Sequence, residues 1–365
     1  MATKLDIPVR LVRLSERLRY RLYRIHRKLA PPPVAMLELI LATWTSQAIE
    51  VAAELGIADE LAVGPLTGDE LAQRVGADPD ALRRLMRALI SRGVFRQLGD
   101  GTYALNPLAD TLRADAPVSM AGAALFYGSV QHREHWSMLA QSIRTGSASI
   151  PLLRGKGFFD YLDDDAELAR LFNAAMTSIS ELAQDSIVAA YDFTRCREIV
   201  DVGGGHGRLL AAILSAAPAA RGVLYDLPDV VAAAPELLSK LVVAERVRID
   251  QGSFFESVPA GADTYVLKNI IHDWPDDDAA AILRNVRAAM GAKATILLVE
   301  LVIPEHDRDF IGKWADLEML LGVDGRERTA EEYRTLLARC GFTMTRVVPT
   351  ASPFSLVQAS AGRIE

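Results

Sequence analysis

The stretch that decides the fold is Ile199-Val200-Asp201-Val202-Gly203-Gly204-Gly205-His206-Gly207, followed by Arg208-Leu209-Leu210-Ala211-Ala212-Ile213-Leu214. An apolar strand that runs through a glycine turn into a helix is typical of sheets that bind a nucleoside cofactor at the turn. Glycine lets the backbone come close to such a cofactor because it has no Cβ and tolerates positive φ. Taken alone, the run could also be an ordinary strand-to-helix turn.

The glycine spacing indicates which kind of cofactor this turn would bind. A dinucleotide fingerprint requires a third glycine three positions after the second, and Arg208 stands there, whereas Gly203, Gly205 and Gly207 alternate. The spacing therefore disfavours NAD and favours a nucleoside without a pyrophosphate. Asp226 ends the next expected strand, nineteen positions beyond Gly207. A carboxylate there can accept hydrogen bonds from both ribose hydroxyls.

A third stretch makes the pattern specific. Asp263-Thr264-Tyr265-Val266-Leu267-Lys268-Asn269-Ile270-Ile271-His272-Asp273-Trp274 predicts a strand that ends at Lys268, with a histidine one helical turn later. Together the three stretches resemble the class I S-adenosylmethionine-dependent small-molecule O-methyltransferases, which include caffeate, hydroxyindole and polyketide enzymes and carry an N-terminal winged-helix dimerisation domain. The resemblance covers roughly residues 36 to 360 and is also carried by residues 253–259, 298–305 and 325–329.

The resemblance implies S-adenosylmethionine as the cofactor and S-adenosylhomocysteine as its product. The residues that it assigns to cofactor binding are Asp201, Gly203, Gly204, Gly205, Asp226, Leu227, Ser253, Phe254, Lys268 and Ser180. One position departs from the family, because relatives usually have Asp where this chain has Ser253. A hydroxyl is a weaker acceptor for the adenine amino group, so a reduced cofactor affinity would follow, although Phe254 can still stack on the adenine ring.

His272 is the expected general base. A phenol has a pKa of about 10, so at neutral pH roughly one molecule in a thousand is anionic, and a histidine near pKa 6.5 can take the proton during attack. The resemblance assigns Glu300 and Glu327 as acids that flank the ring, fix its tautomer and stabilise the imidazolium. Asp273 could orient the ring. The alternatives are that His272 caps or packs the following helix, that Glu327 is a solvated loop acid, and that Asp273 caps the helix.

The resemblance also places an acceptor pocket partly in the helices expected between residues 111 and 190. Its candidate residues are Phe172, Met176, Trp136, Asn269 and Met319. For the segments around residues 136 and 172, periodicity alone predicts ordinary core, and this alternative stays open. Asn269 stands where plant enzymes often carry Trp, so we do not assume a plant phenylpropanoid acceptor.

We expect no metal site. The acidic run Asp276-Asp277-Asp278 is typical of a helix start. His132 and His135 could share a helix face, but no set of carboxylates or cysteines accompanies them.

Length and composition set the expected organisation. At 365 residues the chain exceeds a single core, and we expect a basic amphipathic arm over 1–33, a winged-helix-like dimerisation domain over 34–110, a helical linker that contributes to the substrate pocket over 111–190, and a cofactor-binding catalytic domain over 191–365. A net charge of −7 favours small organic substrates over nucleic acid. Two cysteines cannot form a disulfide framework, and we find no secretory or long uncharged apolar segment, so we expect a soluble cytoplasmic protein.

The N-terminal arm concentrates positive charge. Residues 1–33 hold nine Lys or Arg and two acids, and apolar residues at steps of three and four predict an amphipathic helix that ends before Pro31-Pro32-Pro33. We favour a helix that packs within a homodimer. A weak contact with an anionic membrane surface and an organelle presequence are the alternatives.

The region that follows predicts a winged helix. Residues 36–55 form an expected helix that is apolar on more than one face, Thr67-Gly68-Asp69-Glu70 has the form of a capping box, and Asp78-Pro79 opens another helix before a hairpin that turns at 99–101. Six arginines against five acids in residues 66–105 are too few for a DNA-binding surface. The resemblance instead implies a unit that dimerises and helps to close the active site of its partner.

The fold class expected from residue 192 onward is α/β, with a Rossmann-like, doubly wound methyltransferase sheet of seven strands. Strands expected near 198–202, 222–226, 246–250, 263–268 and 295–300 alternate with helices, and two last strands have no room for a crossover and should form an antiparallel edge hairpin. We therefore expect an O-methyltransferase for an aromatic or polyketide-like hydroxyl. The alternatives are a relative diverged to a hydroxylase or decarboxylase, an enzyme for carotenoid-type lipid alcohols, and a DNA-binding regulator.

Overall fold

The computed structural model describes residues 8–362, which divide into two compact units. We call the first the sheet unit; it holds residues 8–20, 139–150 and 183–362. The second, the helical unit, holds residues 21–138 and 151–182. Each unit is described by itself.

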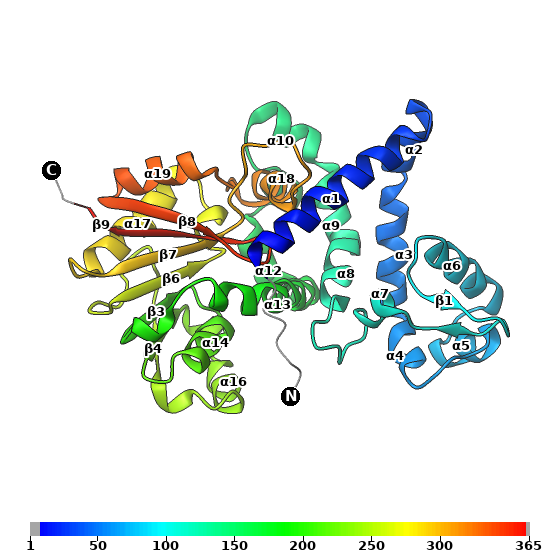
Figure 1. The fold of residues 1–365 in the computed structure, drawn as a ribbon, viewed down its shortest axis with the longest axis horizontal. Helices are drawn as coiled ribbons and strands as arrows, with labels where there is room; N and C mark the ends of the chain where they lie inside the picture. The colour runs from blue at the N-terminus through cyan, green and yellow to red at the C-terminus, as the bar shows by residue number, and fades with distance from the viewer. Residues whose placement is uncertain (1–7, 363–365) are drawn as a thin grey trace. The chain divides into compact units, whose positions relative to one another are not determined.

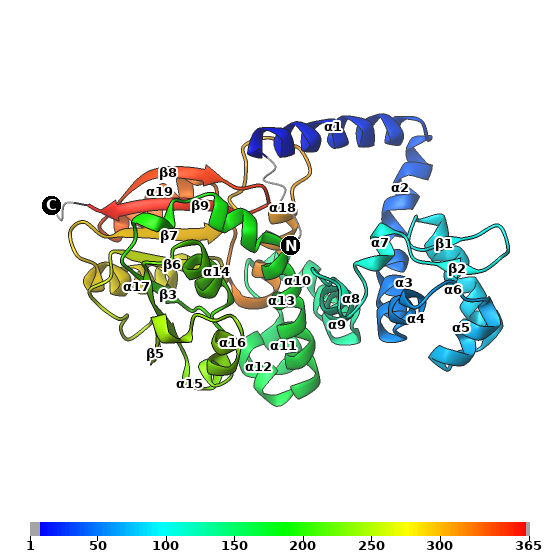
Figure 2. The same cartoon turned by 60° about the horizontal axis from the view of Figure 1, so that its bottom comes forward.

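A seven-stranded sheet forms the centre of the sheet unit, in the order β5-β4-β3-β6-β7-β9-β8 (Figure 1). Its first five members are parallel, and β9 pairs antiparallel with both β7 and β8. Figure 2 shows the β8–β9 hairpin at one edge of the sheet. The predicted doubly wound sheet with an antiparallel edge hairpin is therefore confirmed. The strands are β3 Glu198–Val202, β4 Arg221–Asp226, β5 Val247–Gln251, β6 Thr264–Lys268, β7 Thr295–Glu300, β8 Phe342–Pro349 and β9 Ser355–Ala361.

Helices cover both faces of this sheet, which is why its central strands are continuous apolar runs. On one face, Val200, Tyr265 and Leu298 pack with α17 (Asp276–Ala289) and α19 (Ala330–Arg339). On the other face, α14 (Arg208–Ala216) lies so close that a Cβ on Gly222 would meet Leu210 at 2.8 Å. The remaining helices of the unit are α10 Leu139–Thr145, α15 Pro228–Val231, α16 Ala234–Lys240, α18 Ile311–Val323 and the 3₁₀ turns η1 Phe193–Arg195, η2 Ala244–Arg246 and η3 Ile271–Asp273.

The helical unit contains the capped helices that the sequence predicts. Thr67 and Glu70 form a reciprocal capping box on α5 (Gly68–Val75), and the Asp78 side chain caps α6 (Pro79–Ser91). The hairpin β1 (Arg96–Gln97) and β2 (Tyr103–Ala104) follows. The apolar face of α6 is buried, and its buried residues are Leu82, Met86 and Leu89. The other helices are α4 Ile57–Ala62, α7 Pro107–Asp110, α8 Ala121–Gly128, α9 Val130–Ser137, α11 Ile150–Arg154, α12 Phe158–Asp164 and α13 Ala166–Ala189, the last of which continues into the sheet unit.

The N-terminal helices expose apolar side chains in the single chain. The arm forms the predicted amphipathic helix, α1 (Val9–Lys28), and the helix predicted over 36–55 is divided at Leu41 into α2 (Pro32–Ile40) and α3 (Ala42–Glu54). Taken together, residues Pro32–Glu54 are long enough and apolar enough to cross a membrane, judged by length and composition only. Of their most apolar stretch, 6% is buried. Cover of this surface by a second copy stays a prediction.

Both cysteines are buried and free. Cys196 Sγ accepts a hydrogen bond from Thr264 Oγ1 at 3.2 Å beside β6, and Cys340 follows α19. Burial raises the pKa of both thiols.

Candidate active site

The glycine turn connects β3 to α14 at the carboxyl edge of the sheet. Gly203, Gly205 and Gly207 have φ of +66°, +59° and +82°, a region that favours glycine. Gly204 is fixed by space, because a Cβ there would lie 2.6 Å from Asp201 Oδ2 and from Leu224 Cδ1. The four glycines are therefore required by this turn.

Asp226 ties the end of β4 to the glycine turn. Its Oδ2 accepts from the Gly205 N–H and its Oδ1 from the Leu227 N–H, both at 2.8 Å. Burial raises the pKa of this carboxyl. Each oxygen keeps a second lone pair, so the carboxylate can still accept from a ligand hydroxyl.

Asp201 and Lys268 form a buried pair of opposite charge at the ends of β3 and β6. Burial raises the pKa of Asp201 to about 7, although Lys268 opposes the change, and burial lowers the pKa of Lys268 to about 8 against the effect of Asp201 and Glu300. Lys268 Nζ also lies 5.5 Å from the centre of the Phe354 ring. Asp201 Oδ2 is buried and has no hydrogen-bond partner within residues 8–362. A buried unpaired acceptor of this kind suits a ligand that brings a donor or a positive charge.

Ser253 and Phe254 lie in the turn after β5. Ser253 Oγ accepts from the Phe255 N–H at 3.2 Å, so the hydroxyl already serves the turn. Phe254 Cε1 lies 3.5 Å from the place of a Cβ on Gly203, which puts the ring beside the glycine turn. Asn285, which sequence reasoning missed, holds this turn by donating to the Phe254 and Phe255 carbonyls at 2.9 and 2.8 Å.

His272 lies in η3, directly after β6, and is surrounded by three carboxylates. Its Nδ1 is 2.7 Å from Glu327 Oε1 and 3.9 Å from Glu300 Oε2, and its Nε2 is 3.3 Å from Asp273 Oδ1. Glu300 Oε1 also accepts from the Ile271 N–H at 3.0 Å. The four residues expected to carry the chemistry are thus brought together.

Three of the structural alternatives for this cluster are wrong: helix capping by His272, helix capping by Asp273, and a solvated Glu327. α17 begins at Asp276 with Pro275 as its N-cap, so neither His272 nor Asp273 caps that helix. Glu327 is 3% exposed and is therefore not a solvated loop acid. The expected acidic helix start at Asp276-Asp277-Asp278 is confirmed.

The carboxylates change the protonation of the imidazole. Burial disfavours the imidazolium, but Asp273, Glu300 and Glu327 outweigh it and raise the pKa of His272 to about 10. Burial also raises the pKa of Glu300 to about 7 and that of Asp273 to about 6, with His272 opposing both changes. The carboxylates therefore favour the imidazolium form of His272 more strongly than the ordinary histidine pKa would indicate.

The same cluster is the one group of potential metal ligands found in residues 8–362. The ligand atoms of His272, Glu300 and Glu327 lie within 4.8 Å of one another. An ion bound there would have to replace the Nδ1–Glu327 hydrogen bond. His135 Nε2 instead accepts from Arg154 Nε at 3.2 Å, and the His132 ring lies 5.1 Å from both Phe126 and Tyr127.

Asn269 and α18 complete the sheet unit's part of the site. Asn269 has φ of +54°, and its Oδ1 is buried with no partner in the described part of the chain. Met319 is half-buried on α18. Asp316, on the same helix, accepts the Glu327 N–H at 2.9 Å and so helps to place that acid. Sequence reasoning missed Asp316.

The other predicted pocket residues lie in the helical unit. The Phe172 ring on α13 packs at 5.5 Å from Phe126 and 5.3 Å from Phe158, and Met176 packs on the same cluster. Trp136 lies on α9 with its ring 6.3 Å from His132, and Ser180 lies further along α13. These contacts agree with the core alternative, and the role in an acceptor pocket or beside the cofactor stays a prediction.

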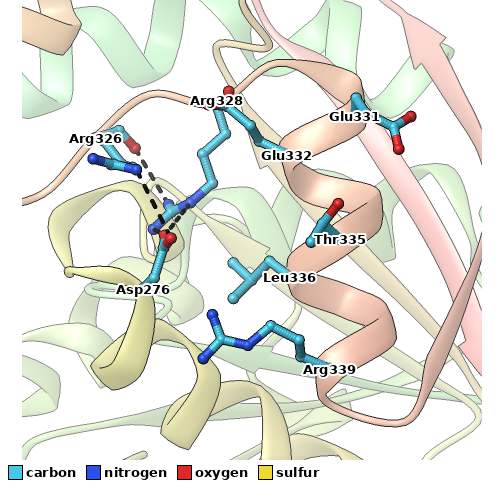
Figure 3. Close-up of a pocket in the computed structure, with 8 residues that line it drawn as sticks. All are labelled: Asp276, Arg326, Arg328, Glu331, Glu332, Thr335, Leu336 and Arg339. Carbon is cyan, nitrogen blue, oxygen red and sulfur yellow. Dashed lines mark hydrogen bonds and ion pairs between the residues drawn. The ribbon is translucent and has the colours of Figure 1, made fainter.

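Arg328 is a buried charge that sequence reasoning missed, and it is 1% exposed. Figure 3 shows it against Asp276 at a surface cavity of about 160 Å³, which Arg326 and Arg339 also line. A signal was present in the sequence, because Arg328 directly follows Glu327 in the segment of residues 325–329 that carries part of the family resemblance.

Comparison with known proteins gives matches along most of the chain. A model of an O-methyltransferase domain matches residues 136–343, and one of an O-methyltransferase dimerisation domain matches residues 37–115. The phenazine O-methyltransferase PhzM of Lysobacter antibioticus is 41% identical over 324 residues, 89% of this chain and 95% of that protein. An 8-amino-8-demethylriboflavin N,N-dimethyltransferase of Streptomyces davaonensis is 36% identical over 84% of this chain and 89% of its own length.

A solved structure similar to this chain is a complex with two small molecules. It is the O-methyltransferase NcsB1 from neocarzinostatin biosynthesis, in complex with S-adenosylmethionine and 2-hydroxy-5-methyl naphthoic acid. The two chains are 35% identical with a TM-score of 0.73, and the match covers 87% of this chain and 96% of that one.

Proposed function

The chain belongs to the S-adenosylmethionine-dependent O-methyltransferase family, and on that basis we propose that it methylates a hydroxyl of an aromatic or polyketide-like small molecule with His272 as general base. The observation that carries the proposal is the buried His272–Glu327 hydrogen bond of 2.7 Å, in the loop that directly follows β6. Sheets of this class place their ligands at that edge.

The residues at the glycine turn fit the family's cofactor. Asp226 offers free lone pairs to a ribose, Asp201 offers a buried unpaired oxygen, and Phe254 offers a ring beside Gly203. When bound, the cofactor supplies a methyl group already activated on a sulfonium. The chain's own residues must then align the acceptor and remove its proton.

His272 performs the second of these tasks in the proposed mechanism. Because Glu327 accepts at Nδ1, the neutral ring carries its proton on Nδ1 and presents Nε2 as the base. Nε2 takes the hydroxyl proton as the oxygen attacks, and Glu327 and Glu300 stabilise the imidazolium that forms. This arrangement favours an oxygen acceptor over an aromatic amine, which can attack through its lone pair before it loses a proton.

We further propose that no metal takes part, since the base is already held by a carboxylate hydrogen bond. Turnover should then survive dialysis against EDTA. Loss of turnover that Mg²⁺ or Zn²⁺ restores would instead support an ion bound by His272, Glu300 and Glu327.

The dimerisation domain indicates a homodimer. We propose a cytoplasmic enzyme whose basic arm makes at most a weak contact with anionic membranes. Leu11, Leu14 and Leu18 on α1 are each at least 55% exposed, and arginines accompany them. Sedimentation with anionic and with neutral vesicles tests this contact. Binding to anionic vesicles would favour the lipid-alcohol alternative, and binding to neither would contradict the membrane contact.

The deciding experiment measures S-adenosylhomocysteine formed from S-adenosylmethionine with a panel of phenols, quinols and lipid alcohols. With any acceptor that turns over, His272→Ala should lower kcat by about a hundredfold or more, as expected for loss of general-base catalysis. His26→Ala, which changes an exposed histidine of the arm, should leave kcat unchanged. Oxygen uptake or release of carbon dioxide without methyl transfer would contradict the proposal and favour the diverged-enzyme alternative.

A further inference from the structure

The buried Arg328 guanidinium is fully occupied by hydrogen bonds, four of which go to residues 271–276 around His272. It donates from Nη1 to the Ile271 carbonyl at 2.9 Å and from Nη2 to the Trp274 carbonyl at 3.1 Å. It also donates to Asp276 Oδ1 from Nη2 at 2.8 Å and from Nε at 3.1 Å, and from Nη1 to the Arg326 carbonyl at 3.3 Å. These five hydrogen bonds use all five N–H donors of the side chain.

The Ile271 and Trp274 carbonyls lie on either side of His272 along the chain. Residues 272 and 273, between them, carry the imidazole and its neighbouring carboxylate. The chain around Arg328 also holds this turn through its backbone, because the Arg326 N–H donates to the His272 carbonyl at 2.8 Å. Gly325 lies so close to the turn that a Cβ would meet the same carbonyl at 2.2 Å.

Glu327 therefore reaches His272 from a segment, residues 326–328, whose first and last residues both hydrogen-bond to the loop that carries His272. Glu327 lies between Arg326 and Arg328, and both of these residues bind the loop of residues 271–276. We propose that Arg328 is a positioning residue, which clamps the η3 turn so that His272 Nδ1 stays in hydrogen-bond contact with Glu327. This inference rests on the proposed role of His272 as base.

Lysine could not replace this clamp. Its ammonium is a compact charge with three donors, whereas the guanidinium is a planar fork whose donors point to both sides. A lysine at 328 keeps the positive charge near Asp276, which is partly exposed and can turn to water, but it cannot reach both the Ile271 and the Trp274 carbonyls. The Arg328→Lys variant thus separates geometry from charge.

The test uses the full-length dimer and compares Arg328→Lys with Arg339→Lys. Arg339 lines the same cavity (Figure 3), is 49% exposed and pairs with Asp277, so it is a matched control. Two readouts are made: kcat and KM at saturating cofactor, and the imidazole pKa of His272 by NMR of histidine-labelled protein, assigned with His272→Gln. The NMR readout does not depend on turnover, so a wrong proposed function and a wrong clamp give different results.

We expect Arg328→Lys to lower kcat about tenfold to a hundredfold, the range expected when a catalytic group is displaced by about 1 Å. KM for the cofactor should stay within about twofold, and the His272 pKa should fall because the contact with Glu327 is lost. Arg339→Lys should change neither. A native kcat together with a native His272 pKa in Arg328→Lys would overturn the clamp.

A second variant guards against a simple folding defect. Arg328→Ala leaves the place of the guanidinium empty beside the surface cavity of about 160 Å³. Millimolar guanidinium should enter there, restore part of kcat and return the His272 pKa toward its native value. The same additive should not affect Arg339→Ala. Loss of activity in Arg328→Ala that guanidinium leaves unchanged in both readouts would count against the proposal.

Discussion

Glu327→Gln gives the sharpest test of how the acids control His272. The substitution keeps the size of the side chain and an oxygen near Nδ1, but it removes the charge that lies 2.7 Å from the ring. A hydrogen bond to a charged group contributes about 1.5–3 kcal/mol, against about 0.5–1.5 kcal/mol for a neutral one. The difference of roughly 1 kcal/mol or slightly more corresponds to a fall of about one in the pKa of His272.

The sign follows from the direction of the native pKa. Three carboxylates raise the pKa of His272 to about 10, so the neutral base becomes populated only as pH rises toward that value. The kcat/KM of the native enzyme, which reports the ionisations of the ligand-free enzyme, should therefore increase from pH 7 toward pH 10. In Glu327→Gln the same rise should occur about one pH unit lower, because one of the acids that favour the imidazolium has gone.

The assay is a pH profile of kcat/KM with one acceptor, measured for the two enzymes under the same conditions. Glu331→Gln is the matched control, because it makes the same change of charge at an exposed residue four positions along the chain. Its profile should overlay that of the native enzyme. A midpoint in Glu327→Gln that equals or exceeds the native one would refute the conclusion that the Glu327 carboxylate stabilises the imidazolium of His272.

Three further substitutions test other parts of the molecule. Gly204→Ala should weaken cofactor binding at least about tenfold and lower Tm, because its Cβ would lie 2.6 Å from Asp201 Oδ2. The control Gly291→Ala, with nothing within 4 Å of its Cβ, should keep the native cofactor affinity and Tm. Equal behaviour of the two variants in calorimetry would contradict the steric explanation. Asp226→Asn removes a charged acceptor and should lower cofactor affinity about tenfold, so an affinity within twofold of native would exclude a ribose contact at Asp226. Asp78→Ala removes the side-chain cap of α6 and should cost about 1 kcal/mol of unfolding free energy, measured by urea denaturation, and an unchanged midpoint would show that the cap is not needed.

The sheet and the capped helices could be predicted because their signals are local. The apolar runs of β3, β6 and β7 lie next to one another in a buried parallel sheet, and such strands need no partner information to be recognised. The caps at Thr67 and Asp78 act within three residues of themselves. The order of the glycine turn, Asp226 and His272 along the chain likewise indicated one edge of one sheet.

The detail of the base could not be predicted, because it depends on contacts between distant residues. Arg328 reaches back to Ile271 and Trp274, and α17 begins only after Pro275, so the loop forms a 3₁₀ turn at a place where the sequence alone also allows a helix to begin. The raised pKa of His272 arises first from its neighbour Asp273, but also from acids on β7 and in the 327 loop, whose distances to the ring exist only in the folded chain.

The two buried thiols can report on transient opening of the sheet unit in the unmodified protein. Cys196 and Cys340 both belong to the sheet unit, and each is at most 6% exposed with a raised pKa. An alkylating reagent can reach them only when strands or helices of that unit separate, and even then it meets a protonated, weakly nucleophilic sulfur. The labelling rate of the unmodified protein would thus time excursions of the sheet unit alone, and a cofactor that binds at its glycine turn should slow that rate in proportion to the stability it adds.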